Sequence, residues 1–213
     1  MEDNRYKVVI LGESEIGKDE LISSIINKSF FDPNSKISKS SQFVVKTLCF
    51  PNGKFVKLEI WNTAGQEKFR PLTKIFYKDA KVIILVYDIT SKNSFTELKQ
   101  YWYEQIKLYG RKGVIFAVCA NKVEYYEKLQ VAEKEGKEFA KNIGEGFFCS
   151  SSLSDAGIDN MLDYIGKKLL DPSYDFYEEE KKLKEEYERK KKERMYLKEK
   201  LKEKNKKNNC IIF

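Results

Sequence analysis

The sequence predicts an α/β fold in which a mostly parallel six-stranded sheet is covered by helices on both faces. Three expected strands, 7–11, 81–89 and 114–122, are apolar almost throughout, as strands buried on both faces are. Segments with helical spacing of apolar residues alternate with these strands, which is typical of a parallel sheet. The sequence PNGK at 51–54 separates two further strand-like segments and predicts a hairpin, which adds one antiparallel edge.

The other elements follow from local patterns along the chain. The β-branched run at 7–11 stops at Gly12, and apolar residues between 18 and 28 then recur at helical spacing. Residues 32–42 have the composition of a loop. In chain order we expect strand 7–11, helix 18–28, strands 43–50 and 56–61, strand 81–89, helix 94–109, strand 114–122, helix 132–142, strand 146–151 and helix 156–170.

Length and charge divide the chain into a domain and a tail. The 213 residues, 41% of them hydrophobic, suffice for one domain with a substantial core and an appendage. Residues 178–207 hold 14 basic and nine acidic residues, and so +5 of the net charge of +7. We expect a domain at 1–171, a charged helical tail at 172–209 and a short motif at 210–213. The basic tail suggests an anionic membrane or partner, and the nearly neutral domain argues against nucleic-acid binding.

The tail has two possible interpretations. Four apolar residues fall on one stripe of the expected helix, with Lys190 and Arg194 between them; they are Leu183, Tyr187, Leu197 and Leu201. Such a stripe is a weak coiled-coil seam, but a single solvated helix is the favoured interpretation.

Several kinds of chemistry lack their usual residues. The chain has no histidine, which removes the commonest zinc ligand and the commonest general base. Its four cysteines are scattered, without metal-like spacing. The N-terminal residues MEDNRYK lack the apolar core of a signal peptide, and the longest apolar run, 82–87, is too short to cross a bilayer. We therefore expect a reduced, cytosolic protein.

A glycine-rich motif marks the first functional site. Gly12-x4-Gly17-Lys18 follows a strand and opens a helix, which is the context that a phosphate-binding loop requires. Backbone N–H groups of such a loop converge on an anion at the positive end of the helix, and Lys18 adds a point charge.

Three further motifs follow in a fixed order: WNTAGQE at 61–67, NKVE at 121–124 and SSL at 151–153. With the phosphate loop they resemble the small GTPases of the Ras superfamily, which share the P-loop NTPase fold. The stretches WNTAGQEKFRPLTKIFYKDA and VYDITSKNSF are similar to the Rab branch. The resemblance covers roughly residues 5–170 and argues against an unrelated ATPase.

The resemblance implies GTP/GDP and Mg²⁺ as cofactors, and it assigns a role to each matching position. Gln66 would orient the attacking water, and Mg²⁺ would be held by Asp19, Ser38 and Asn62. The effector surface would comprise Phe43, Trp61 and Phe76. The nucleotide-binding positions would be Gly12, Glu15, Ile16, Gly17, Lys18, Asp19, Gly65, Asn121, Lys122, Glu124, Ser151, Ser152 and Leu153.

Several of these positions depart from the family pattern. Asp19 replaces the metal-binding hydroxyl and Asn62 replaces an aspartate, so one carboxylate remains near the metal but on the other residue. Glu15 stands in place of a loop glycine, where a carboxylate competes with phosphate for the field of the helix. Glu124 replaces the aspartate that grips guanine, and Ser152 replaces an alanine. These changes predict weak, fast-exchanging nucleotide binding with slow or absent hydrolysis.

The last four residues, Cys210-Ile-Ile-Phe213, form a C-a-a-X motif that predicts geranylgeranylation of Cys210. The upstream lysines supply a second membrane signal, so we expect a location on the cytoplasmic face of a membrane, with a cytosolic pool. Two functions follow. One is a membrane-anchored GTP/GDP switch in vesicle trafficking that recruits effector and regulator proteins. The alternative is a non-catalytic pseudo-GTPase scaffold that recruits partners to a membrane.

Overall fold

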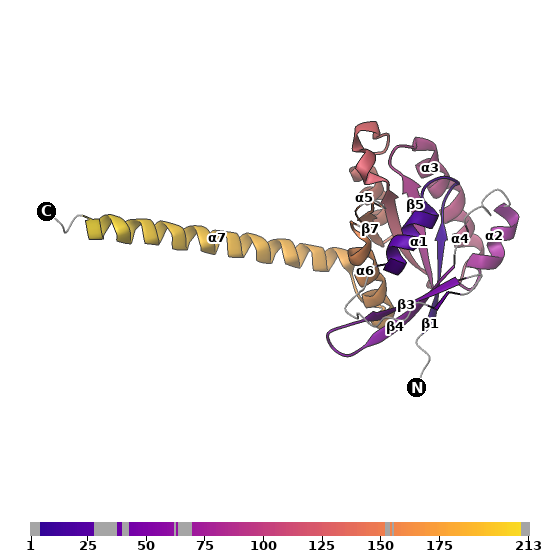
Figure 1. Ribbon diagram of the computed structural model, residues 1–213, viewed down its shortest axis with the longest axis horizontal. Coiled ribbons are helices and arrows are strands. Elements are labelled where there is room, and N and C mark those ends of the chain that lie inside the picture. Colours follow the sequence, from indigo (N-terminus) through magenta and orange to yellow (C-terminus); the bar gives the residue numbers. More distant parts are fainter. Residues whose placement is uncertain are drawn as a thin grey trace. The chain divides into compact units, whose positions relative to one another are not determined.

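The computed structural model describes residues 5–27, 38–39, 43–61, 63, 70–151, 154 and 156–209. The chain divides into two compact units, Met1–Tyr174 and Asp175–Phe213. The first unit is an α/β domain, and the described part of the second is a long helix (Figure 1).

A seven-stranded sheet forms the centre of the first unit, in the order β2-β3-β4-β1-β5-β6-β7. Its strands are β1 (Arg5–Leu11), β2 (Ser38–Lys39), β3 (Phe43–Cys49), β4 (Phe55–Trp61), β5 (Val82–Asp88), β6 (Ile115–Asn121) and β7 (Gly146–Cys149). All neighbours pair in parallel from β4 to β7, while β3 pairs antiparallel with both β4 and β2. The six expected strands are therefore confirmed, and the two-residue β2 extends the hairpin edge.

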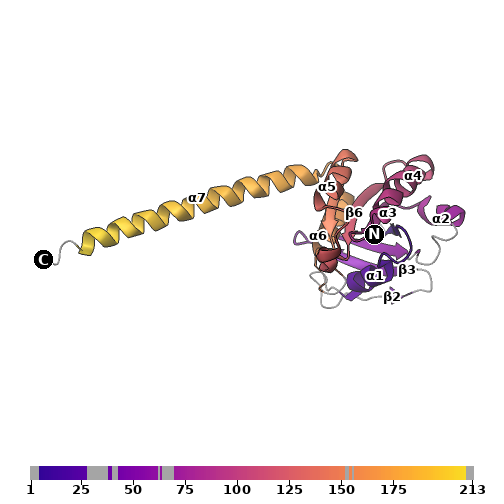
Figure 2. The ribbon, with the colours of Figure 1, turned by 90° about the horizontal axis from the view of Figure 1, so that it is seen from above.

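Helices cover both faces of this sheet, as expected. Figure 2 shows α1 (Lys18–Asn27) and α6 (Ile158–Leu170) on one side of the strands, with α3 (Lys92–Glu97), α4 (Glu104–Tyr109) and α5 (Glu133–Asn142) on the other. Because side chains alternate along a strand, each inner strand supplies one apolar row to each layer. This double coverage explains why β5 and β6 are buried at every position.

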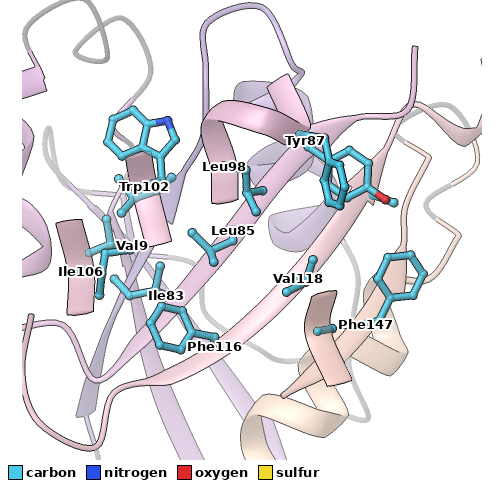
Figure 3. Packing of buried hydrophobic residues seen from close by; sticks show 14 of the residues in the cluster. Val9, Ile83, Leu85, Tyr87, Leu98, Trp102, Ile106, Phe116, Val118 and Phe147 are labelled. Carbon is cyan, nitrogen blue, oxygen red and sulfur yellow. The ribbon is translucent and has the colours of Figure 1, made fainter. Parts of the chain in front are cut away.

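The core under α3, α4 and α5 is continuous from β1 to β7 (Figure 3). It joins side chains from four parallel strands with aromatic and aliphatic side chains from the helices; the labelled members are Val9, Ile83, Leu85, Tyr87, Leu98, Trp102, Ile106, Phe116, Val118 and Phe147. Gly136 of α5 allows the closest approach, since a Cβ there would lie 2.4 Å from both the Phe147 ring and the Tyr87 hydroxyl. This packing holds the carboxyl ends of β5 and β6 in place, which is the edge of the sheet where the site lies.

Three details differ from the sequence expectation. The helix expected at 94–109 begins at Lys92, capped by the Ser91 side chain, and its middle turn is the π-helix η2 (Leu98–Tyr103). Helix α2 (Arg70–Tyr77) and the 3-10 helix η3 (Val123–Lys128) were not expected. Each spans eight residues or fewer, which offers too little periodicity to stand out from a loop.

The second unit contains helix α7 (Phe176–Asn209). Asp175 caps its start, because its carboxylate accepts the backbone N–H groups of Tyr177 (2.9 Å) and Glu178 (3.1 Å). Ion pairs one turn apart follow, Glu180 with Lys184 at 3.2 Å and Glu186 with Lys190 at 2.7 Å. Leu183 and Tyr187 are each more than half exposed within this unit. Local charge pairing thus accompanies a helix with few buried side chains.

Candidate functional site

The loop between β1 and α1 has the shape of a phosphate cradle. Gly17 and Glu15 both take positive φ, 86° and 62°, and α1 begins at the next residue, Lys18. Lys18 is 4% exposed, and its ammonium donates hydrogen bonds to the carbonyl oxygens of Gly12 (3.1 Å) and Glu13 (2.5 Å). The loop is therefore wound around its own lysine, and its turns resemble the backbone arrangements that bind anions.

Close packing explains the two glycines of this loop. A Cβ on Gly17 would lie 2.6 Å from the amide nitrogen of Asn121, and its positive φ disfavours any side chain. A Cβ on Gly12 would lie 2.3 Å from the carbonyl oxygen of Val86 in β5. Glu15 occupies a left-handed position that costs a non-glycine residue about 1 kcal/mol.

Asn121, at the end of β6, holds the loop from the side. It is fully buried, and its amide nitrogen donates to the carbonyl oxygens of Ile16 (2.8 Å) and Gly17 (3.4 Å). Its side-chain oxygen accepts a hydrogen bond from Ser150 at 2.8 Å. Ser150 was not among the expected site residues, although it directly precedes Ser151. Asn121 thus ties the phosphate loop to the segment that follows β7.

Lys122 makes a second link between the phosphate loop and the end of β6. Its backbone is left-handed, with φ 63°, and its ammonium donates to the carbonyl oxygen of Glu15 at 2.6 Å. The same ammonium pairs with the Asp88 carboxylate at 2.8 Å. Burial opposes the ionised form of Asp88, but hydrogen bonds from Lys122 and Thr90 outweigh it and hold the pKa of Asp88 below its usual value. Sequence reasoning missed Asp88; a charged residue that ends a buried strand was the available signal.

The carboxylates of Glu15 and Asp19 face a different environment. Both residues are exposed, and Asp19 lies in the first turn of α1 directly after Lys18. The structure thus places two exposed acidic residues in the phosphate loop and in the first turn of the helix that follows it. Negative side chains at a helix N-terminus are favourable by themselves, but they use the same positive field that a phosphate would use.

The base-binding side of the site contains an unpaired acceptor. Glu124 lies in the first turn of η3, and its Oε2 atom is buried without a hydrogen-bond partner among the residues that the structure describes. Ser151 is 3% exposed and lies beyond β7. A buried carboxylate oxygen without a partner is unfavourable, and N–H donors such as those of a guanine edge would satisfy it. The residues present therefore fit a guanine nucleotide, with Lys18 at the phosphates.

The predicted metal and hydrolysis residues are only partly described. Asn62, Gly65 and Gln66 lie outside the described residues, as do Ser152, Leu153 and Cys210, and only the backbone of Ser38 is described. Within the described part of the chain, no group of three or more acidic, histidine or cysteine side chains could hold a metal ion. A site with one carboxylate and neutral oxygen donors fits Mg²⁺, because this ion keeps several of its water ligands when it binds to a protein. Asp19 is the described member of that set.

The three aromatic residues predicted for an effector surface come together at the junction of β3, β4 and α2. The rings of Phe43 and Trp61 stack with centroids 5.1 Å apart, and those of Trp61 and Phe76 lie 6.2 Å apart. The Lys7 ammonium lies 4.6 Å from the centre of the Trp61 ring. All three aromatic residues are half-buried, so their edges remain available to a partner.

Helices of the described ranges are all too short or too polar to span a bilayer. The parallel sheet and the phosphate loop around Lys18 together define a P-loop fold, and the acceptor at Glu124 fits a guanine base.

Comparisons with known proteins specify this class further. The model of the Ras family matches residues 7–171. Ras-related protein RABC1 of Arabidopsis thaliana is 35% identical over 170 residues, which is 79% of each chain. Ras-related protein Rab-22A of Homo sapiens is 31% identical over 169 residues, 79% of this chain and 84% of the relative. Ras-related protein Rab-2B of Dictyostelium discoideum is 32% identical over 168 residues, 79% of this chain and 82% of the relative. The chain belongs to the Ras family and is a Rab-like small GTPase.

Proposed function

We propose that this protein is a membrane-anchored Rab-like switch in vesicle trafficking whose hold on guanine nucleotide and Mg²⁺ is weakened and whose hydrolysis of GTP is slow or absent. One observation carries the proposal: a phosphate loop that keeps Gly12, Gly17 and Lys18 has the exposed carboxylate of Asp19 directly after its lysine. Membership of the Ras family supports a role as a GTP/GDP switch, and the position of Asp19 supports weakened nucleotide binding.

Repulsion between the Asp19 carboxylate and a bound phosphate would weaken nucleotide binding. Two like charges about 8 Å apart, at an effective dielectric constant of about 20, repel each other by about 2 kcal/mol. Asp19 alone would then reduce the affinity for a phosphate by about thirtyfold in the absence of a metal ion between them. Glu15 adds a second carboxylate, and because both residues are exposed, solvent and salt screen the two charges alike.

Recognition of the base is the part that we propose to be retained. The unpaired Oε2 atom of Glu124 supports guanine, since the base offers adjacent N–H donors. Asn121 and Lys122 contribute by holding the phosphate loop next to it. When bound, the nucleotide's γ-phosphate with Mg²⁺ is what orders the switch segments of such proteins.

Membrane attachment is proposed through Cys210. The C-a-a-X sequence predicts a prenyl group, and the basic residues of α7 supply attraction to anionic lipid. Mass spectrometry of protein isolated from cells tests this directly, because an unmodified Cys210 would refute the anchor.

A second function, a pseudo-GTPase scaffold, is favoured by α7. Its 34 residues form one continuous helix that presents exposed Leu183, Tyr187 and Leu197. A partner bound there would be recruited whether or not nucleotide is present. Release of nucleotide from denatured protein, repeated with and without Mg²⁺, tests both functions: substoichiometric guanine nucleotide supports the weakened switch, absence of nucleotide supports the scaffold, and stoichiometric, tightly held GDP contradicts both.

Two substitutions test the cause of the weakening. We expect Asp19→Ser combined with Asn62→Asp to raise GDP affinity sharply, as measured by calorimetry with Mg²⁺. If the site instead works with exchanged charges, each single change lowers the affinity and the pair restores it. Glu20→Gln is the matched control, because it removes a negative charge from the same helical turn without touching a predicted metal position. An equal gain from that control would show that general charge, and not the metal position, is responsible.

A further inference from the structure

A hydrogen bond links the phosphate loop to a helix on one face of the sheet. The indole Nε1–H of Trp102 donates to the Glu13 carboxylate at 2.9 Å, although the two residues are 89 positions apart. Glu13 is the residue after Gly12, so its carboxylate belongs to the phosphate loop itself. Neither residue was singled out by the sequence motifs.

Trp102 is held in one orientation by its surroundings. The residue is 1% exposed, and its ring meets the Tyr101 ring edge-on at 5.1 Å. Trp102 belongs to the same buried cluster as Val9 and Ile106, and Figure 3 shows the indole nitrogen on the side away from them. Trp102 lies in the π-helical turn η2, a distortion that is frequent at functional sites because it redirects side chains.

Glu13 is therefore fixed at two points. Its carbonyl oxygen accepts a hydrogen bond from the Lys18 ammonium at 2.5 Å, and its carboxylate accepts one from Trp102. A carboxylate bound to η2 is directed toward the helix layer instead of across the loop. The loop already carries Glu15 at its mouth, so the direction of a second acid matters for any bound anion.

We propose that Trp102 is a positioning residue that holds the Glu13 carboxylate out of the phosphate-binding space. This inference rests on the proposed nucleotide-binding function and adds a residue outside the motifs that define it. The helix layer under α3 and α4 thus takes part in setting the charge that a phosphate meets. Loss of the indole donor releases that charge toward the loop, and the nucleotide is bound more weakly.

A double-mutant cycle tests the proposal. Trp102→Phe keeps an aromatic ring but removes the donor, and Glu13→Gln keeps an acceptor but removes the charge. Calorimetry with GDP, and separately with pyrophosphate, should show about fivefold weaker binding for Trp102→Phe, since at an effective dielectric constant of about 20 a unit charge that moves from about 10 Å to about 6 Å from the anion weakens binding by a factor of that order. In the Glu13→Gln background, the same change should alter the affinity less than twofold.

A conservative change in the same helical turn serves as the control. Tyr103→Phe removes a hydroxyl from the same π-helical turn and should leave affinity unchanged. An equal loss for Trp102→Phe in both backgrounds would mean that Trp102 acts only through packing, and the proposal would be wrong.

A second measurement requires no nucleotide. In ¹⁵N–¹H spectra of the full chain, the indole resonance that disappears in Trp102→Phe should shift in Glu13→Ala, and an unshifted resonance would overturn the inference. If the wild-type protein binds neither GDP nor pyrophosphate, the proposed function fails, while the indole shift still decides whether Trp102 holds Glu13.

Discussion

The pair formed by Asp88 and Lys122 provides the sharpest test of how the phosphate loop is supported. Asp88→Asn is nearly isosteric, and the new amide oxygen can still accept hydrogen bonds from the backbone and hydroxyl of Thr90, which lie at 2.7 and 2.6 Å. Its NH₂ group would then face the Lys122 ammonium, 2.8 Å from the present carboxylate oxygen. The substitution therefore removes one charged interaction and leaves the local turn intact.

The burial of the two side chains determines how much the substitution lowers the free energy of unfolding. Asp88 is 8% exposed and Lys122 is 26% exposed, so the pair is largely removed from water. Losing one partner of a fully buried pair costs about 3–5 kcal/mol, and a hydrogen bond to a charged group contributes about 1.5–3 kcal/mol. Because Lys122 can gain some hydration, we expect a loss of about 2 kcal/mol in the free energy of unfolding. For a domain of this size that lowers Tm by about 4–8 °C.

Urea denaturation between pH 3 and pH 7 measures this loss and its origin. The pKa of Asp88 is lowered in the folded state, so its contribution is complete above the unfolded pKa of about 4 and disappears as the pH falls through the folded pKa. The difference between wild type and Asp88→Asn should therefore be largest at pH 7 and shrink toward pH 3.

A matched pair on the surface serves as the control. Asp163 and Lys167 of α6 are also 2.8 Å apart, but each is about one-third exposed. Asp163→Asn should cost about 0.5 kcal/mol or less, as exposed helix pairs do. If Asp88→Asn costs no more than this control, the support that we assign to the buried pair is wrong.

Three further predictions follow from the same structure. Gly17→Ala should lower the stability of the domain by about 2 kcal/mol, measured by urea denaturation, because the new Cβ would meet Asn121 at 2.6 Å and φ is positive; a neutral result would mean that the loop is not held by Asn121. Burial raises the pKa of Cys119 to about 12, so iodoacetamide at pH 8 should alkylate it only after unfolding, as peptide mass mapping would reveal; modification of the native protein would contradict its burial. Lys190 and Arg194 would face their copies in a paired α7, so sedimentation of the full chain should show a monomer, and a stable dimer would restore the coiled-coil interpretation.

Much of the domain could be predicted because its patterns are local. The apolar runs at β5 and β6 reflect burial on both faces, and Gly12, Gly17 and Lys18 stand at the strand-to-helix junction that a phosphate loop needs. The aromatic cluster of Phe43, Trp61 and Phe76 was expected from the family resemblance, and the rings do meet. Its role toward effectors stays a prediction.

The supports of the site could not be predicted, because they join residues that are distant in sequence. Asp88 meets Lys122 only because β5 and β6 are neighbours in parallel register, and Trp102 of η2 reaches Glu13 across 89 positions of the chain. Composition and spacing determined the class of fold and the chemistry at the mouth of the loop. The three-dimensional packing alone decided which buried donors and charges hold that loop in place, since such contacts depend on strand order and helix geometry that no local pattern encodes.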